Sequence, residues 1–187
     1  MVKSKQLLAL VAMGICISQN PNAQASPVEM KPDYYSKVIV DAAVKNDIPY
    51  VYLYSLAAKE SSAKLENGKR RPWPYTMNYK GKGYYFRSYA DLVKASQRLL
   101  DSGENNFDVG IFQINYMWNT DRFDGITDLA HPAKNAEIAA QILKEKYDSW
   151  VIAAGRYHNP ANKNGRANAY SREYLEFLEL VKIDILP

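Results

Sequence analysis

The sequence predicts a mostly helical α+β domain with one small β-hairpin lobe. Apolar residues recur at helical spacing along much of the chain, which favours amphipathic helices. In the middle, two aromatic runs flank a glycine-containing tetrapeptide, a pattern typical of a β-hairpin. The chain has 187 residues, 47% of them hydrophobic and 24% charged, values that are ordinary for a globular protein. That length is enough for one domain with its own core.

The first 25 residues have the organisation of a secretory signal peptide. Lys3 and Lys5 give a basic start, and residues 7–17 form an unbroken apolar run. Ala23-Gln24-Ala25 then fits the small-x-small cleavage pattern. The run is too short to span a bilayer comfortably, so a retained anchor is the weaker alternative. We expect cleavage after Ala25, a periplasmic location, and no membrane association of the mature chain.

Cleavage would leave residues 26–32 as a linker and residues 33–187 as the folded domain. Cys16 would leave with the leader, so the mature chain would contain neither a disulfide nor a thiol nucleophile. The net formal charge would fall from +4 to +2, because two lysines and no acid are removed. So mild a charge gives no reason to expect a nucleic-acid partner. His131 and His158 lack ligand-like spacing, so no metal or other cofactor is expected.

The first two helices are predicted from apolar stripes on either side of a break at residues 47–49. Within residues 33–46, Ile39 and the apolar residues one helical turn from it lie on a single face. Pro49 suits the first turn of the second helix, residues 49–62, because the N–H that it lacks has no helical partner there.

The β-hairpin follows a segment that is incompatible with helix. Residues 67–71 form a basic loop, and the Pro72-Trp73-Pro74 triplet cannot continue a helix. Aromatic, β-prone runs at 75–79 and 84–87 then flank Lys80-Gly81-Lys82-Gly83. This arrangement predicts two strands joined by a four-residue loop.

Helical patterns return after the hairpin. Ser88, with Asp91 three residues later, resembles a capping box that opens a helix to about Ser102, and Gly103 stands where a helix-ending glycine is expected. Residues 118–130 are expected to connect through short turns. Three further helices are expected over residues 132–147, 149–157 and 167–183, with Tyr147, Tyr157 and Tyr170 on their inward stripes.

Glu60 is the candidate catalytic acid. It continues the apolar stripe of Leu53, Leu56 and Ala57 near the end of the second helix. Burial removes hydration from a charged carboxylate and raises its pKa, so that the group can donate a proton near neutral pH. The alternative is a helix-end glutamate whose carboxylate simply reaches water.

Three short stretches carry the candidate site. They are Glu60-Ser61, then Gly110-Ile111-Phe112-Gln113, then Arg156-Tyr157-His158. Taken singly, each has an ordinary structural explanation. In this order they resemble the Glu-Ser, Gly-Leu-Met-Gln and Ala-Tyr-Asn motifs of lysozyme-like lytic transglycosylases of the soluble (SLT, glycoside hydrolase family 23) type. The insert around residues 72–86 is similar to that of members found with conjugation and type IV secretion systems.

The resemblance implies a lysozyme-like fold and a reaction. Such enzymes cleave the β-1,4 bond between N-acetylmuramic acid and N-acetylglucosamine in peptidoglycan without water, leaving a 1,6-anhydromuramyl product. Glu60 would act first as acid and then as base. Substrate contacts are implied for Ser61, for Gln113, and for the backbone of Ile111-Phe112. Tyr157 would orient the acid or the acetamido group of the substrate.

The third stretch departs from the family pattern. Arg156 and His158 stand where alanine and asparagine are usual, so Asn159 is the candidate to take over the contacts of that asparagine. The resemblance implies peptidoglycan glycan strands as the partner, with proteins of a secretion or conjugation apparatus as candidate further partners.

Two alternatives stay open. A goose-type-lysozyme-like hydrolase would share the fold but deliver water, and would want a second carboxylate across the cleft. Asp101 and Asp108 are the acids close to the second stretch. A non-catalytic cell-wall-binding scaffold would keep the fold without the chemistry.

Overall fold

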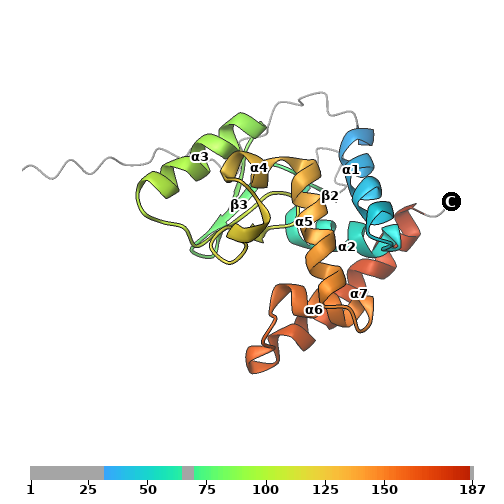
Figure 1. The fold of residues 1–187 in the computed structure, drawn as a ribbon. Helices are drawn as coiled ribbons and strands as arrows, with labels where there is room; N and C mark the ends of the chain where they lie inside the picture. The colour runs from blue at the N-terminus through green and yellow to red at the C-terminus, as the bar shows by residue number, and fades with distance from the viewer. Residues whose placement is uncertain (1–31, 65–69, 186–187) are drawn as a thin grey trace, which may run out of the picture.

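The computed structural model describes residues 32–64 and 70–185. A body of helices lies on one side and a small sheet lobe on the other, as Figure 1 shows. The expected signal peptide, and the linker up to residue 31, lie outside the described residues. Within the described part of the chain, no helix is long and apolar enough to cross a membrane. The predicted mostly helical α+β class is confirmed.

The elements follow one another in a helix–sheet–helix order. The helices are α1 (Pro32–Lys45), α2 (Tyr50–Ser61), α3 (Tyr89–Asp101), α4 (Ile126–Ala130), α5 (Pro132–Glu145), α6 (Trp150–His158) and α7 (Arg166–Ile185), with 3-10 turns at Thr120–Arg122 and Lys163–Gly165. The strands are β1 (Ser62–Lys64), β2 (Arg70–Pro72), β3 (Thr76–Tyr79), β4 (Lys82–Tyr85), β5 (Phe107–Val109) and β6 (Ile114–Asn115).

Helix α2 is the centre of the helical body. Leu53, Leu56 and Ala57 are 0% exposed, and the helix packs against α1 and α7. Helix α5 lies against α1 and α6 (Figure 1). Full burial of one leucine side chain stabilises a fold by roughly 1.5–3 kcal/mol, so the apolar face of α2 fixes the position of its last turn.

The sheet lobe is antiparallel, with strand order β4-β3-β5-β6. The predicted hairpin is present, but its loop is shorter than the predicted tetrapeptide. Lys82 and Gly83 pair with Tyr79 and Asn78, which leaves a two-residue turn at Lys80-Gly81. Both turn residues have positive φ, 52° and 77°, as the tight turns that match strand twist require.

Helix α3 has both of its predicted ends. The hydroxyl of Ser88 accepts the backbone N–H of Asp91 at 3.1 Å, which confirms the cap. Gly103, at φ 82°, ends the helix, and the N–H of Glu104 reaches back to the carbonyl of Leu99 at 2.9 Å. This is the bond pattern of a Schellman motif.

Three predictions about the connecting segments are wrong. Residues 70 and 71, expected in a loop, belong to strand β2, which pairs with β1 and has Pro72 at its end opposite Ser62. Tyr147, expected inward, is 55% exposed because α5 stops at Glu145, and its ring lies 4.3 Å from that of Trp150. Residues 118–130, expected to form only short turns, contain helix α4.

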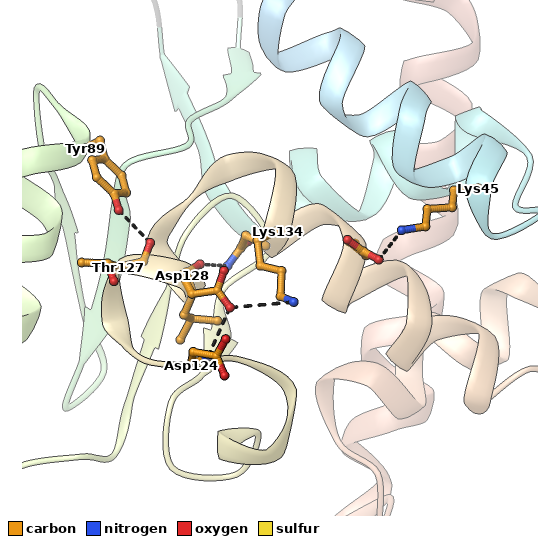
Figure 2. Close-up of polar contacts among 9 residues, drawn as sticks. Lys45, Tyr89, Asp124, Thr127, Asp128 and Lys134 are labelled. Atoms are coloured by element: carbon orange, nitrogen blue, oxygen red, sulfur yellow. Dashed lines mark hydrogen bonds and ion pairs between the residues drawn. The ribbon is translucent and has the colours of Figure 1, made fainter.

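Helix α4 is too short to show a periodic pattern and is held by its neighbours. Figure 2 shows the hydroxyl of Tyr89 donating to the carbonyl of Thr127 at 2.7 Å. It also shows Lys134 of α5 beside Asp128, with Nζ 3.8 Å from Oδ2. The position of α4 is therefore set by contacts from α3 and α5 that no local pattern reveals.

Candidate active site

Glu60 lies in the last turn of α2, where the helix meets α7. Its side chain is half-buried, which places it at the edge of the apolar stripe as the sequence predicts. The hydroxyl of Tyr170, on α7, donates a hydrogen bond to Oε1 of Glu60. Tyr170 is itself buried, so the phenol is held against the carboxyl by the α2–α7 packing.

The surroundings of Glu60 raise its pKa to about 7. Loss of hydration is the largest cause, because burial penalises the charged form. The hydrogen bond from Tyr170 acts in the opposite direction, the negative charge of Asp108 raises the pKa further, and the positive charge of Lys59 lowers it. A carboxyl with this pKa can both give and take a proton at neutral pH.

The ring of Tyr170 is surrounded by charged and aromatic groups. Lys59 Nζ lies 4.5 Å from the ring centroid and 2.6 Å from Oε2 of Glu173. The imidazole of His158, at the end of α6, stacks on the same ring with centroids 4.5 Å apart and planes 15° apart. Burial lowers the pKa of His158, as does the charge of Lys59, which favours the neutral imidazole in this stack.

The second stretch forms a tight turn between β5 and β6. Gly110 and Gln113 both have positive φ, 85° and 49°. The amide nitrogen of Gln113 donates to the hydroxyl of Thr76 at 2.7 Å and to the carbonyl of Gly110 at 2.9 Å. Within the described residues the amide oxygen of Gln113 accepts no hydrogen bond.

Asn135 on α5 supports this turn and was not predicted. It is 0% exposed; its oxygen accepts the N–H of Phe112 at 2.9 Å, and its nitrogen donates to the carbonyls of Val109 and Leu129 at 3.0 Å. A methyl group on Gly110 would lie 2.4 Å from the Asn135 nitrogen, so glycine is needed for both backbone shape and space. The sequence did contain a signal for this role, because Asn135 is a polar residue inside the apolar stripe of α5.

Tyr157 joins the third stretch to the second. Its hydroxyl donates to the carbonyl of Phe112 at 2.8 Å. Burial raises its pKa well above the ordinary value, and the charges of Glu60 and Asp108 add to this effect. The phenol therefore stays protonated, and all three stretches lie within electrostatic reach of one another. The predicted hydrogen bond of Tyr157 to Glu60 is not made, because the Tyr157 hydroxyl donates to Phe112, and Tyr170 bonds to Glu60 instead. A contact of Tyr157 with the acetamido group of the substrate stays a prediction.

The remaining predicted site residues are engaged within the protein. Ser61 is 1% exposed and donates its hydroxyl to the carbonyl of Ala57 at 3.0 Å. Ile111 and Phe112 are 0% exposed, and the N–H and carbonyl of Phe112 are already engaged by Asn135 and Tyr157. The side-chain oxygen of Asn159 accepts the N–H of Lys163 at 2.9 Å. Direct substrate contacts by these residues stay predictions.

Of the two acids considered for a second carboxylate, Asp108 is the one near Glu60. It lies on β5, burial raises its pKa, and it accepts a 2.8 Å hydrogen bond from Asn115. Asp101 is exposed on α3 and accepts from Gln97. Among the described residues, no group of three or more histidine, cysteine or acidic side chains is arranged to hold a metal ion.

Tyr170 is the site residue that periodicity placed correctly but explained incompletely. The helical stripe of α7 predicts that its ring is buried, and it is 7% exposed. The stripe gives no information on the hydroxyl, whose partner Glu60 is 110 residues away. A buried tyrosine needs a partner for its O–H, and that requirement was the signal available.

The geometry agrees with the comparison to known families. The family model described as the transglycosylase SLT domain matches residues 37–178, a range that includes Glu60, Gln113, Tyr157 and Tyr170. Searches of curated proteins and of solved structures gave no match. Because the family model covers well over half of the chain, the protein belongs to the transglycosylase SLT family, the lytic transglycosylases that act on peptidoglycan.

Proposed function

We propose that this protein cleaves the bond between N-acetylmuramic acid and N-acetylglucosamine and leaves a 1,6-anhydromuramyl end, with Glu60 as the catalytic acid and base. The observation that carries the proposal is the environment of Glu60. Its pKa of about 7 and its hydrogen bond from Tyr170 give one carboxyl the properties that both proton transfers need.

The reaction proceeds in two steps. Protonated Glu60 first gives its proton to the glycosidic oxygen, the bond from C1 to that oxygen breaks, and the N-acetylglucosamine part leaves with a free hydroxyl. The 2-acetamido group of the muramyl sugar stabilises the positive charge that develops at C1. Glu60 is then ionised and takes the proton of the C6 hydroxyl. The C6 oxygen attacks C1, which closes the anhydro ring and returns the acid to its starting state.

The neighbouring residues hold the reacting groups in place. The hydroxyl of Tyr170 donates to one oxygen of the Glu60 carboxylate and so orients it, which leaves the second oxygen for the substrate. The free amide oxygen of Gln113 accepts a hydrogen bond from a sugar hydroxyl or an acetamido N–H. Tyr157 fixes the carbonyl of Phe112 and thereby the shape of the turn that carries Gln113.

The predicted leader and the insert support the proposed cellular setting. A signal peptide cleaved after Ala25 delivers the domain to the periplasm, where peptidoglycan lies. The insert around residues 72–86 is similar to that of members associated with conjugation and type IV secretion. The enzyme opens the cell wall locally for such an apparatus, with components of the apparatus as partners.

Glu60→Gln tests the catalytic assignment. The variant should lose clearing of peptidoglycan in a gel while it still binds isolated sacculi, because the amide keeps the shape but carries no transferable proton. Glu176→Gln, an exposed glutamate on α7, is the matched control and should clear normally. Unchanged clearing by Glu60→Gln would overturn the assignment. Clearing by neither the native protein nor the control would favour a binding scaffold.

The hydrolase alternative rests on Asp108. Its charge acts on Glu60, so it could in principle activate a water molecule. Mass spectrometry of digested sacculi separates the two reactions, because a transglycosylase leaves anhydromuramyl ends and a hydrolase leaves reducing ends. We expect anhydro ends from both the native protein and Asp108→Asn; reducing ends that disappear in Asp108→Asn would establish hydrolysis.

A further inference from the structure

A positively charged side chain lies against the tyrosine that bonds to Glu60. Lys59 precedes Glu60 in the last turn of α2, and its Nζ lies 4.5 Å from the ring centroid of Tyr170 and 5.4 Å from that of Phe177. Both distances are within the roughly 6 Å at which a cation is attracted to the face of an aromatic ring. The same nitrogen is 2.6 Å from Oε2 of Glu173. Lys59 therefore joins the end of α2 to two rings and a carboxylate of α7.

These partners of Lys59 share one face of α7. Tyr170, Glu173 and Phe177 stand at i, i+3 and i+7, the spacing that places side chains above one another on a helix. The Lys59 side chain is only 11% exposed, whereas that of Glu173 is 64% exposed. A cation so far out of water needs neighbours that replace its hydration, and the carboxylate and the two rings do so here. The ammonium is therefore held in one place.

Charged and titratable groups lie around the Glu60–Tyr170 bond on each element packed there. They are Lys59 on α2, Tyr157 and His158 on α6, Asp108 on β5, and Arg166, Arg172, Glu173 and Tyr174 on α7. Lys59 contacts the Tyr170 ring through its ammonium, and His158 contacts it by stacking. Burial lowers the pKa of His158, so at neutral pH Lys59 supplies the positive charge on this ring.

A cation on the face of a phenol has two effects on its hydroxyl. It restrains the ring, and because the phenol oxygen lies in the ring plane, a fixed plane fixes where the hydroxyl points. It also draws electron density from the ring, which makes the O–H a better donor to a carboxylate. Both effects favour the hydrogen bond from Tyr170 to Glu60.

We propose that Lys59 is a positioning residue for the proton transfers: its ammonium, held by Glu173, fixes the Tyr170 ring and thereby aims the Tyr170 hydroxyl at Glu60. This role rests on the proposed function, because the carboxyl that is aimed is the one assigned to the acid step. It differs from the direct effect of the Lys59 charge, which lowers the pKa of Glu60 without help from the phenol.

Lys59→Met and Tyr170→Phe, alone and combined, test this role. Methionine keeps an unbranched stem without the charge, and phenylalanine keeps the ring without the hydroxyl. Lys59→Met should lower kcat about tenfold with little change in KM, because a loosened phenol orients the carboxyl poorly. In the Tyr170→Phe background the same change should lower kcat less than about twofold, since no hydroxyl remains to be aimed. Release of anhydromuramyl products from sacculi measures the rates.

Three further variants serve as controls, and thermal unfolding checks that every variant is folded. Lys59→Arg should keep kcat within about twofold of the native value, because a guanidinium also pairs with carboxylates and stacks on rings. Glu173→Gln leaves the ammonium without its ion-pair partner and should lower kcat by up to about threefold. Lys144→Met removes an exposed ion pair of α5 with Asp47 and should leave kcat unchanged.

Two results would overturn the role. One is a loss of kcat on Lys59→Met that is the same with and without the Tyr170 hydroxyl, because Lys59 would then act on Glu60 directly or through the stability of α2. The other is a Glu173→Gln variant with native kcat whose alkaline limb moves to lower pH, the direction expected when an unpaired cation lowers the pKa of Glu60. Failure of the Glu60 assignment shows separately, as activity retained by Glu60→Gln.

Discussion

The hydroxyl of Tyr170 on α7 donates a hydrogen bond to the carboxyl of Glu60 on α2, across 110 residues of sequence. Burial favours the protonated form of the acid and the bond favours the ionised form, and these two effects, with the charges of Asp108 and Lys59, leave a pKa of about 7. The α2–α7 contact therefore sets both the direction of the carboxyl and its proton affinity.

Removing this hydroxyl should shift the pH dependence of activity. In the proposed mechanism Glu60 must start protonated, so kcat/KM falls as the pH rises through about 7. Tyr170→Phe removes a group that lowers the pKa of Glu60, so the alkaline limb should move to higher pH. The rate at the optimum should fall by up to about a hundredfold, because the carboxyl is less well oriented. Sacculus clearing between pH 5 and 9 measures both effects.

Tyr174→Phe is the control for this prediction. It removes a buried hydroxyl one turn further along α7, where the phenol donates to the carbonyl of Tyr52 at 2.6 Å. Stability should fall, but the alkaline limb should stay in place. If the alkaline limb of the pH–activity profile moved equally in both variants, general loosening of α7, and not the bond to Glu60, would control the pKa of Glu60.

Glu60 should also make the stability of the protein depend on pH. Its folded-state pKa of about 7 is above the ordinary value of 4.5, so between these pH values the folded state binds more protons than the unfolded state. Stability is therefore lost as the pH rises from about 4.5 to about 7. Glu60→Gln removes this loss and should be more stable than the native protein by up to about 3 kcal/mol at pH 8.

Urea unfolding at pH 4 and pH 8 checks this expectation. At pH 4 Glu60 is largely protonated in both states, so the difference between Glu60→Gln and the native protein should nearly vanish. A difference that is the same at both pH values would mean that the amide changes packing and not proton binding.

The stacking of His158 on Tyr170 should support stability and activity through the aromatic ring of His158 and not through its charge. His158→Ala should lower the free energy of unfolding by about 1 kcal/mol and reduce kcat with little change in KM, because Tyr170 loses a packing partner. His158→Phe keeps an aromatic ring and should restore most of both losses. His131→Ala is the control. The native His131 ring lies edge-on to the ring of Tyr89, with centroids 6.2 Å apart, and its removal should change neither kcat nor the alkaline limb of the pH profile. If His158→Phe lost as much stability and activity as His158→Ala, the stacking role would be refuted.

Periodicity and capping predicted most of the helical frame, because both are local properties. Ser88 and Gly103 fixed the two ends of α3 from their residue types alone. Glu60 could be singled out because an acid stood on an apolar stripe. Helix α4 and strand β2 were not foreseen, since each is short and depends on partners distant in sequence.

The support of the site could be predicted less well than its motifs. Asn135 and Tyr170 act through hydrogen bonds that join segments 23 and 110 residues apart, and such pairings leave no trace in local spacing. His158 was visible as a departure from the family pattern, but its stack on Tyr170 depends on the crossing of α6 and α7.

The turn that carries Gln113 should depend on the fit between Gly110 and Asn135. Gly110→Ala puts a methyl group 2.4 Å from the Asn135 nitrogen and a side chain on a residue with φ 85°. We expect a loss of more than about 3 kcal/mol in the free energy of unfolding, together with loss of clearing. Gly103→Ala isolates the backbone cost, because φ is 82° there and no atom lies within 4 Å of the added carbon. It should cost only about 1 kcal/mol.

Asn135→Ala completes the comparison. Alone it leaves the N–H of Phe112 and two carbonyls without their partner, and should cost about 2–4 kcal/mol. Combined with Gly110→Ala it removes the atom that the methyl group meets, so the double variant should be less destabilised than the sum of the single ones. Urea unfolding of the four proteins gives this coupling directly. Strict additivity would mean that Gly110 is required for its backbone conformation alone and not for the close approach of Asn135.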